Sequence, residues 1–437
     1  MPNFKQIGLV FVYIISFVCL HFFVKQADFV PLLLAYSAMF AVYIVWLKKP
    51  PKLIWWLVAL LVTRFVSFFA LPSLSDDFYR FLWDGMLTVN GGNPFLNFPV
   101  DEVLEGMHPS ASEWLAQMNS ANYYSVYPVF SQWIFAAMYS ISDGHELGAV
   151  NVFRCIVLLA EIGVCWFLLL KKSGDNQLKK YVPLLLLNPL YLVETYGNIH
   201  FEGLVVMMLV LAVVCYQRHQ KIVAVLLTTA AFLTKLIPLI ILPVLLKKLN
   251  WKERIGMGIL GLAFTLILCY YFVAPLWLSN QLESMRLYFQ VFEFNAGLYF
   301  LIRWIGFKLV GYNIIAWIGA ITPWIIGGIA LYLQWAKKWN NNAVSKSMYY
   351  SVLIYYGLSS IVHPWYAIYA ILPGLMIHSS LVVVWSYAVI FSYVFYAVGD
   401  SFWYYWLVFI EYVLLLLTAY FFDKKKYFFK AETQNTN

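Results

Sequence analysis

Long apolar runs alternate with short polar segments along most of this chain. A helix needs about 20 apolar residues to cross a bilayer, because hydrocarbon offers its backbone no hydrogen-bond partner. The runs predict about 12–14 membrane-spanning helices, several of them short or interrupted by proline or glycine. The pattern therefore predicts an all-α integral membrane protein, a polytopic helix bundle. The expected spans are 7–24, 29–47, 53–71, 149–170, 181–193, 203–217, 222–235, 237–247, 255–277, 312–335, 348–362, 366–378, 380–398 and 403–422.

One long hydrophilic stretch, residues 72–148, interrupts this pattern and forms a large loop. The apolar segment Val129 to Ile141 inside it is too short to span a bilayer, and so is Leu298 to Val310. We expect Val129 to Ile141 to be an interfacial or re-entrant helix and Leu298 to Val310 to lie along the membrane surface. The chain then divides into an added N-terminal transmembrane hairpin over 1–52, a transmembrane module over 53–378 that includes the loop, and a C-terminal hairpin with a basic tail over 379–437.

Basic residues in short loops predict the orientation of the spans, because such loops stay in the cytoplasm. A topology with both termini inside places every basic cluster inside and the loop 72–148 outside. Most acidic residues then lie outside, so we expect a site on the outer face of the bacterial plasma (inner) membrane. The clusters are Lys48, Lys49 and Lys52; Lys171, Lys172, Lys179 and Lys180; Arg218 and Lys221; Lys247, Lys248, Lys252 and Arg254; Lys337, Lys338 and Lys346; and Lys424 to Lys426.

Composition excludes several classes of protein. Hydrophobic residues make up 63% of the chain and charged residues 11%, against roughly 45–50% and about 25% in soluble domains. The net charge of +8 does not indicate nucleic-acid binding, since the lysines fall in short clusters between apolar runs. All five cysteines lie inside apolar runs, which predicts neither disulfides nor a metal site.

Two adjacent carboxylates, Asp76 and Asp77, directly follow the span that ends near Leu71. They have two possible roles. Aspartate often caps a helix, and a helix is expected to follow. Alternatively, desolvation at the membrane and the close like charge would raise the pKa of one carboxylate toward that of a general base, which Arg80 would oppose.

A second polar cluster occupies a short outer loop. Glu194, Asn198, His200 and Glu202 fall within nine residues between short spans, where polar groups are costly unless they face water or each other. The cluster indicates either a binding or catalytic site or a solvated turn. Lys235 is either a snorkelling lysine or a cation for a lipid phosphate, and we expect no metal, because no further ligands stand at metal-site spacing.

Several motifs in this order resemble a known family. They are SDDFYRFLWDG at 75–85, GGNPF at 91–95, Tyr127-Pro128, Asn188-Pro189, GNIHFEG at 197–203, KLIP at 235–238, Glu293-Phe294-Asn295 and HPWY at 363–366. The chain resembles polyprenyl-phosphate-sugar-dependent glycosyltransferases of the C-type (GT-C) fold, especially the bacterial mannosyltransferase-like members. The resemblance covers about residues 70 to 375, with one departure at Val129, where a second proline is expected.

This resemblance implies a GT-C-like fold and an inverting transfer of a hexose, with mannose favoured, from a polyprenyl-phosphate donor to a glycan, glycolipid or protein acceptor. It implies no cofactor. Asp76 or Asp77 would be the catalytic base. The implied substrate-binding residues are Arg80, Asp84, Asn93, Glu194, Asn198, His200, Glu202, Lys235, Arg303, His363 and Tyr366.

Two alternatives to an enzyme are a polytopic transporter or flippase of lipid or sugar and a structural partner in a cell-envelope complex. Transporters place ionisable groups near the bilayer midplane and often consist of repeated halves. Here the charged residues gather outside the spans and the sequence shows no repeat, which favours the enzyme.

Overall fold

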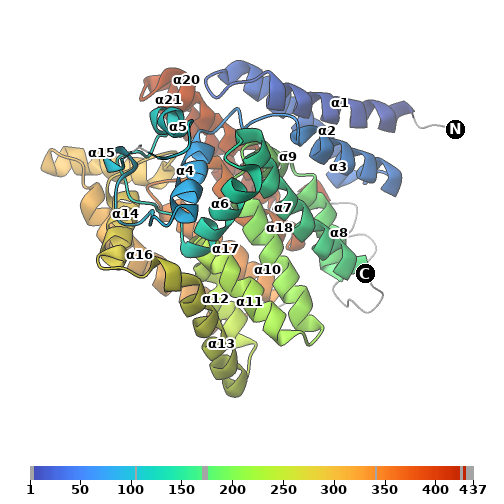
Figure 1. The fold of residues 1–437 in the computed structure, drawn as a ribbon. Helices are drawn as coiled ribbons and strands as arrows, with labels where there is room; N and C mark the ends of the chain where they lie inside the picture. Colours follow the sequence, from blue (N-terminus) through green and yellow to red (C-terminus); the bar gives the residue numbers. More distant parts are fainter. Residues whose placement is uncertain (1–3, 104–105, 170–175, 340–341, 424–426, 430–437) are drawn as a thin grey trace. The chain divides into compact units, whose positions relative to one another are not determined.

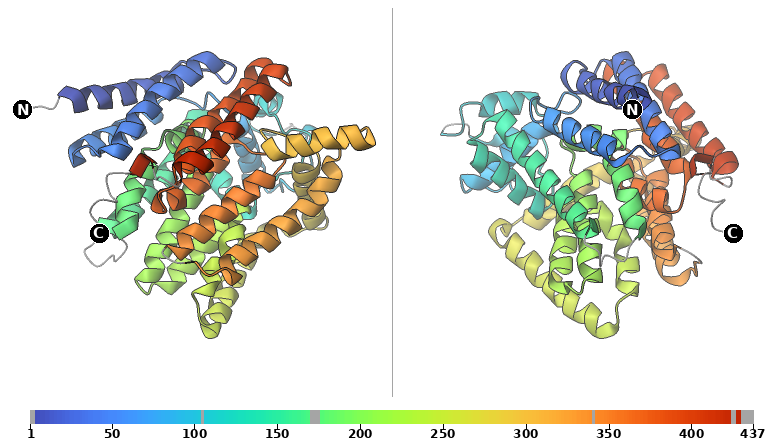
Figure 2. Two further views of the ribbon diagram at one scale, coloured as in Figure 1. Left: turned by 180° about the vertical axis from the view of Figure 1, so that it is seen from behind. Right: turned by 90° about the vertical axis from the view of Figure 1, so that its right-hand side faces the viewer.

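A computed structural model describes residues 4–103, 106–169, 176–339, 342–423 and 427–429 (Figures 1 and 2). These residues form helices and loops, and an isolated parallel bridge pairs Phe294 with Ile361. The predicted all-α architecture is confirmed. The lysines predicted to be cytoplasmic at Lys171, Lys172 and Lys424 to Lys426 lie outside the described residues.

Seven helices of the described chain are long and apolar enough to cross a membrane, or eight if Pro189–Gly197 and Glu202–Gln217 count as one span. This confirms a polytopic membrane protein but gives fewer long spans than predicted. Several predicted spans form shorter apolar helices, namely Leu53–Ser67, Lys221–Thr234 and Ile237–Lys247. Pro238 and Pro243 lie in the last of these, where proline cannot continue the hydrogen-bond ladder. The seven are Phe4–Phe22, Phe29–Lys48, Glu146–Leu169, Trp251–Phe272, Ile315–Ala336, Ser380–Val398 and Phe402–Phe422.

The chain forms two compact units. Unit 1 comprises Met1–Leu74, Asp175–His200 and Glu293–Asn437. Within it α1 packs against α2 and α3, and α17 packs against α16 and α18. Its α-helices are α1 (Phe4–Phe22), α2 (Phe29–Lys48), α3 (Leu53–Ser67), α8 (Asn176–Leu186), α9 (Pro189–Leu192), α15 (Gly297–Val310), α16 (Ile315–Leu331), α17 (Ala343–Leu358), α18 (Ile368–Met376), α19 (Ser380–Ala388), α20 (Val394–Val398) and α21 (Phe402–Leu417).

Unit 2 comprises Ser75–Gly174 and Phe201–Phe292. Within it α4 packs against α6, α6 against α7, and α10 against α7 and α11. Its α-helices are α4 (Asp77–Val89), α5 (Ala111–Gln117), α6 (Val129–Ser142), α7 (Glu146–Leu169), α10 (Glu202–Gln217), α11 (Lys221–Thr234), α12 (Leu242–Lys247), α13 (Trp251–Cys269) and α14 (Trp277–Gln290). The two predicted interfacial segments are helices α6 and α15, each of 14 residues.

A glycine sets the close approach of α4 to α6. A Cβ atom at Gly85 would lie 2.3 Å from the Phe135 carbonyl oxygen, so any larger residue would push the two helices apart. One turn earlier, Phe81 stacks on Phe135 with 4.5 Å between ring centroids. This packing fixes the first turns of α4, where the two adjacent aspartates lie. The predicted division into 1–52, 53–378 and 379–437 stays a prediction.

Candidate functional site

The paired carboxylates of unit 2 differ in their surroundings. Asp76 directly precedes α4, yet its side chain makes no capping hydrogen bond and is exposed. The Asp77 carboxylate accepts hydrogen bonds from Asn119 Nδ2 at 3.2 Å and from the Tyr127 hydroxyl at 3.3 Å. Asp77 is therefore held by the surrounding loop, whereas the Asp76 carboxylate is accessible and does not cap the helix.

The surroundings of Asp76 and Tyr79 raise the pKa of both side chains. Partial burial raises the pKa of the Asp76 carboxyl above its ordinary value of 3.8, and the neighbouring Asp77 charge raises it further. A carboxylate with a raised pKa binds a proton more readily. Burial, followed by the charges of Glu146, Asp76 and Glu113, raises the pKa of Tyr79 to about 12, so this phenol stays neutral and able to donate a hydrogen bond.

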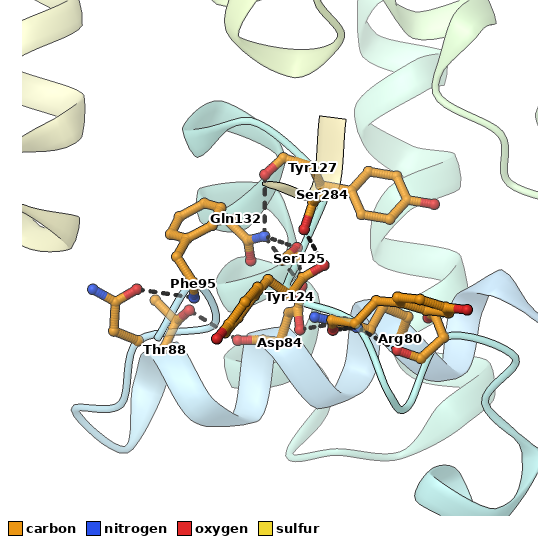
Figure 3. Close-up of polar contacts among 12 residues, drawn as sticks. Arg80, Asp84, Thr88, Phe95, Tyr124, Ser125, Tyr127, Gln132 and Ser284 are labelled. Atoms are coloured by element: carbon orange, nitrogen blue, oxygen red, sulfur yellow. Dashed lines mark hydrogen bonds and ion pairs between the residues drawn. The ribbon is translucent and has the colours of Figure 1, made fainter. Parts of the chain in front are cut away.

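Arg80 and Asp84 form a buried ion pair on α4, at 2.7 Å (Figure 3). Arg80 also donates to the Ser120 and Tyr123 carbonyl oxygens, each at 2.9 Å. Arg80 thus pairs with Asp84, one turn further along α4, because Asp84 is the fully buried carboxylate that needs a counter-charge.

The remaining Asp84 oxygen is also occupied, by Ser125 Oγ at 2.6 Å and Gln132 Nε2 at 3.1 Å (Figure 3). Asn93 likewise donates to the Phe272 carbonyl at 2.9 Å and accepts from the Phe95 amide at 3.1 Å. These side chains hold the loop to the helices of unit 2, and the predicted substrate contacts of Arg80, Asp84 and Asn93 stay predictions.

Lys235 follows α11 and lies beside a buried acid. Its Nζ is 3.3 Å from Glu202 Oε1 and 4.9 Å from the centroid of the Tyr127 ring. Glu202 is fully buried, while the Lys235 side chain is 18% exposed. The Tyr127 ring thus contacts the Lys235 ammonium at its face and Asp77 through its hydroxyl. Lys235 balances the Glu202 charge and keeps enough exposure to meet an anionic ligand.

Glu194, Asn198 and His200 gather in unit 1, as the sequence predicted for them. The fully buried Glu194 carboxylate accepts hydrogen bonds from Asn198 Nδ2, His200 Nδ1 and the Tyr393 hydroxyl, all at 2.9 Å. These three residues form an internal network and not the solvated turn considered as the alternative. The fourth member of the predicted cluster, Glu202, belongs to unit 2.

The HPWY segment contributes aromatic rings to the same unit. His363 is partly exposed and stacks on Trp365 with 4.4 Å between centroids, and Tyr366 approaches His363 edge-on at 5.4 Å. Arg303, on α15, forms an ion pair with Glu293 and lies over the Phe300 ring, 4.8 Å from its centroid. Arg303 is therefore already paired with Glu293.

The family model described as MptA_B family, alpha-(1->6)-mannopyranosyltransferase, N-terminal domain, matches residues 17–249, more than half of the chain. The chain belongs to this family. It is a glycosyltransferase with a mannosyltransferase-type domain, which confirms the resemblance and decides for an enzyme over a transporter. Searches among curated proteins and among solved structures find no match.

The family match includes the paired carboxylates Asp76 and Asp77, which form the carboxylate site, and Lys235. It also includes Glu194, Asn198 and His200, whereas Arg303, His363 and Tyr366 lie beyond it. Within the described residues of this mannosyltransferase-family protein, no three His, Cys, Asp or Glu side chains gather as a metal-ligand set. The predicted independence of metals stays a prediction.

Some residues of these sites could not be found from the sequence. Asn119, Ser125 and Gln132 lie in the large loop or on α6 without any distinctive motif, and they act through hydrogen bonds to Asp77 and Asp84. Tyr393 meets Glu194 across 199 positions of the chain. The one available signal was a tyrosine in a mostly apolar run, which is too common in membrane helices to identify a partner.

Proposed function

We propose that this family member transfers mannose from a polyprenyl-phosphate donor to an acceptor hydroxyl on the outer face of the membrane. The observation that carries the proposal is the exposed Asp76 carboxylate, with its raised pKa, next to an Asp77 carboxylate held by Asn119 and Tyr127. This pairing suits a general base, because the fixed neighbour keeps the accessible carboxylate basic.

The proposed reaction inverts the anomeric carbon. Asp76 takes the proton of the acceptor hydroxyl while that oxygen attacks the anomeric carbon of the donor sugar. The bond from this carbon to the phosphate oxygen breaks, and polyprenyl phosphate leaves with the bonding electrons. Lys235 would stabilise the charge that develops on the phosphate. The acceptor is a glycan, glycolipid or protein.

The distribution of polar residues supports a lipid-linked donor. Enzymes that use nucleotide sugars usually carry a soluble α/β domain with a phosphate-binding loop, whereas the longest hydrophilic stretch of this chain is the loop 72–148 between apolar segments. A lipid-linked sugar brings its phosphate to headgroup level while its chain stays in the bilayer, which suits a site beside membrane helices.

The test of the donor is a competition between two sugar sources. We expect purified protein to form product from polyprenyl-phosphate mannose, and to form none from a nucleotide-activated mannose in membranes stripped of polyprenyl phosphate and of its sugar synthase. Each assay is run with and without a metal chelator. Product from the nucleotide sugar alone would overturn the proposed donor, and loss of product on chelation would overturn metal independence.

The side of the membrane is tested by labelling. Single cysteines placed in the loop, at Ser112 and Gln117, are expected to react with an impermeant thiol reagent added to intact cells. Cysteines at Gln177 and Lys179, in the predicted cytoplasmic loop, are expected to react only after permeabilisation. The reverse pattern would place the loop and its carboxylates in the cytoplasm.

A further inference from the structure

One side chain of unit 2, Tyr127, contacts two groups of opposite charge. The Lys235 ammonium lies over the face of its ring, 4.9 Å from the ring centroid, and its hydroxyl donates to the Asp77 carboxylate at 3.3 Å. A cation within about 6 Å of an aromatic face is attracted by the ring, and a carboxylate accepts a stronger hydrogen bond than a neutral group does. Tyr127 therefore joins the cation of the site to its paired carboxylates.

The Tyr127 ring is itself held in one orientation. It is buried, and the stacked rings of Phe81 and Phe135 meet it at nearly right angles, with 5.1 and 5.3 Å between centroids. The Tyr127 carbonyl accepts a hydrogen bond from Gln132 Nε2 at 3.3 Å (Figure 3). Pro128 follows directly in the sequence and restricts the Tyr127 backbone to extended conformations. The ring is thus a fixed support for the groups that it contacts.

Two contacts position the Lys235 ammonium. One is the Tyr127 ring, and the other is the fully buried Glu202 carboxylate, whose Oε1 lies 3.3 Å from Lys235 Nζ. A buried carboxylate needs a counter-charge, so the ion pair keeps the flexible lysine side chain from turning into water. Lys235 nevertheless remains partly exposed. A phosphate that reaches it meets an ammonium whose place is already set, which is the arrangement that stabilises developing charge best.

An inverting transfer requires a fixed spacing between its base and its phosphate-binding group. The acceptor oxygen, which the base deprotonates, and the leaving phosphate oxygen lie on opposite sides of the anomeric carbon. Misplacement by about 1 Å can lower the rate on the order of 100-fold. The four-carbon stem of a lysine is too flexible to hold such a spacing by itself, whereas an aromatic ring that contacts both groups can hold it.

We infer that Tyr127 is a positioning residue that sets this spacing: its ring places Lys235 for the donor phosphate, and its hydroxyl holds Asp77 beside Asp76. The inference rests on the proposed function and gives Tyr127 no contact with the sugar. The two ends of this side chain then serve different steps, because the ring acts on phosphate binding and the hydroxyl acts on proton removal. Variants that keep one end and lose the other separate these two effects.

The experiment compares two substitutions of Tyr127 and uses short-chain polyprenyl phosphate without sugar as an inhibitor, because this product carries the phosphate alone. Tyr127→Phe keeps the ring and loses the hydroxyl, so we expect kcat to fall on the order of tenfold, with KM for the lipid-linked donor and the inhibition constant little changed. Tyr127→Leu also loses the ring, so we expect the inhibition constant to rise on the order of tenfold as well. Equal inhibition constants in the two variants, or normal turnover in Tyr127→Phe, would contradict the inference.

The matched control is another tyrosine of unit 2. Tyr271→Phe removes a hydroxyl that donates to the Thr88 carbonyl at 2.8 Å, and we expect it to leave kcat and the inhibition constant unchanged. The thermal midpoint of each variant in detergent is measured beside its kinetics. If Tyr271→Phe lowers kcat as much as Tyr127→Phe does, the loss reflects a general loosening of the unit and the positioning role is refuted.

The contact with Lys235 is tested on a background that lacks its charge. Lys235→Met is combined with Glu202→Gln, because removing the lysine alone would leave the buried Glu202 charge without its partner. If Tyr127 acts on the phosphate through Lys235, adding Tyr127→Leu to this pair raises the inhibition constant no further, since the effects of residues in contact are not additive. A further rise would mean that Tyr127 acts by another route, and the inference would fail.

The same measurements distinguish this inference from the proposed function. A wild-type protein that polyprenyl phosphate does not inhibit, or a Lys235→Met/Glu202→Gln variant inhibited as strongly as the wild type, refutes the proposed phosphate contact and the inference with it. A sensitive wild type, a weakly inhibited Lys235→Met/Glu202→Gln variant and a fully sensitive Tyr127→Leu variant refute the positioning role alone and leave the proposed function standing.

Discussion

Replacing Asp76 by asparagine is expected to lower kcat by about 10²–10⁴-fold, the usual contribution of a general base, while the protein still folds. The amide has the same shape but cannot accept the acceptor's proton. Since Asp76 is exposed and makes no capping hydrogen bond, its replacement leaves the start of α4 intact. The measurement is kcat with polyprenyl-phosphate mannose, together with the thermal midpoint of the purified variant in detergent.

The neighbouring residue supplies the control and a pH test. Asp77→Asn keeps hydrogen-bonding groups for Asn119 and Tyr127, so we expect a smaller loss of kcat. Because the pKa of Asp76 is raised, activity should fall as pH drops through this raised value, where the base becomes protonated. Removing the Asp77 charge should move that acidic limb to lower pH. Near-normal turnover in Asp76→Asn would refute the general base.

The fold class was predictable because it depends on local composition. Apolar runs of about 20 residues have few solutions other than membrane helices, and the long helices Phe4–Phe22, Phe29–Lys48 and Glu146–Leu169 appear close to their expected ranges. The number of long spans was overestimated because hydropathy does not distinguish a full span from a shorter apolar helix, such as Leu53–Ser67 or Lys221–Thr234. That distinction depends on packing with distant segments.

The carboxylate site was predictable in position but not in detail. Asp76 and Asp77 stand out because they directly follow an apolar run. Which of the two is held depends on Asn119 and Tyr127, which lie 42 and 50 positions from Asp77. Hydrogen bonds between such distant segments leave no periodic signal in the sequence. Local spacing alone does not identify the partner of Arg80, because Asp77, three residues before it, and Asp84, four residues after it, are both within helical reach.

The contacts of Glu194 show the same limit more strongly. Its bonds to Asn198 and His200 span four and six positions, and the GNIHFEG segment marked these residues. The Tyr393 hydroxyl and the Trp365 ring that complete the arrangement come from helical segments 199 and 165 positions further on. Only the folded chain shows that the Tyr393 hydroxyl, so far along the sequence, is a donor to Glu194.

Replacing Asp84 by alanine is expected to cost about 3–5 kcal/mol of folding free energy, the usual penalty for leaving one member of a buried ion pair without its partner. The Arg80 and Asp84 side chains are 3% and 0% exposed, so water cannot replace the lost carboxylate. Ser125 and Gln132 would lose their shared acceptor as well. The measurement is the denaturation midpoint in mild detergent, with and without the lipid-linked donor.

The lipid donor separates this structural role from the substrate contact that the sequence predicted for the pair. If Arg80 and Asp84 hold the loop against α4, the Asp84→Ala variant is destabilised equally with and without the donor. The double variant Arg80→Met/Asp84→Leu then recovers much of the lost stability, because apolar residues of similar volume replace buried ion pairs well. Glu253→Gln, which breaks the exposed pair with Lys221, is expected to change little, since exposed ion pairs contribute weakly. A stable Asp84→Ala protein with a raised KM for the donor would instead support the predicted contact between Asp84 and the substrate.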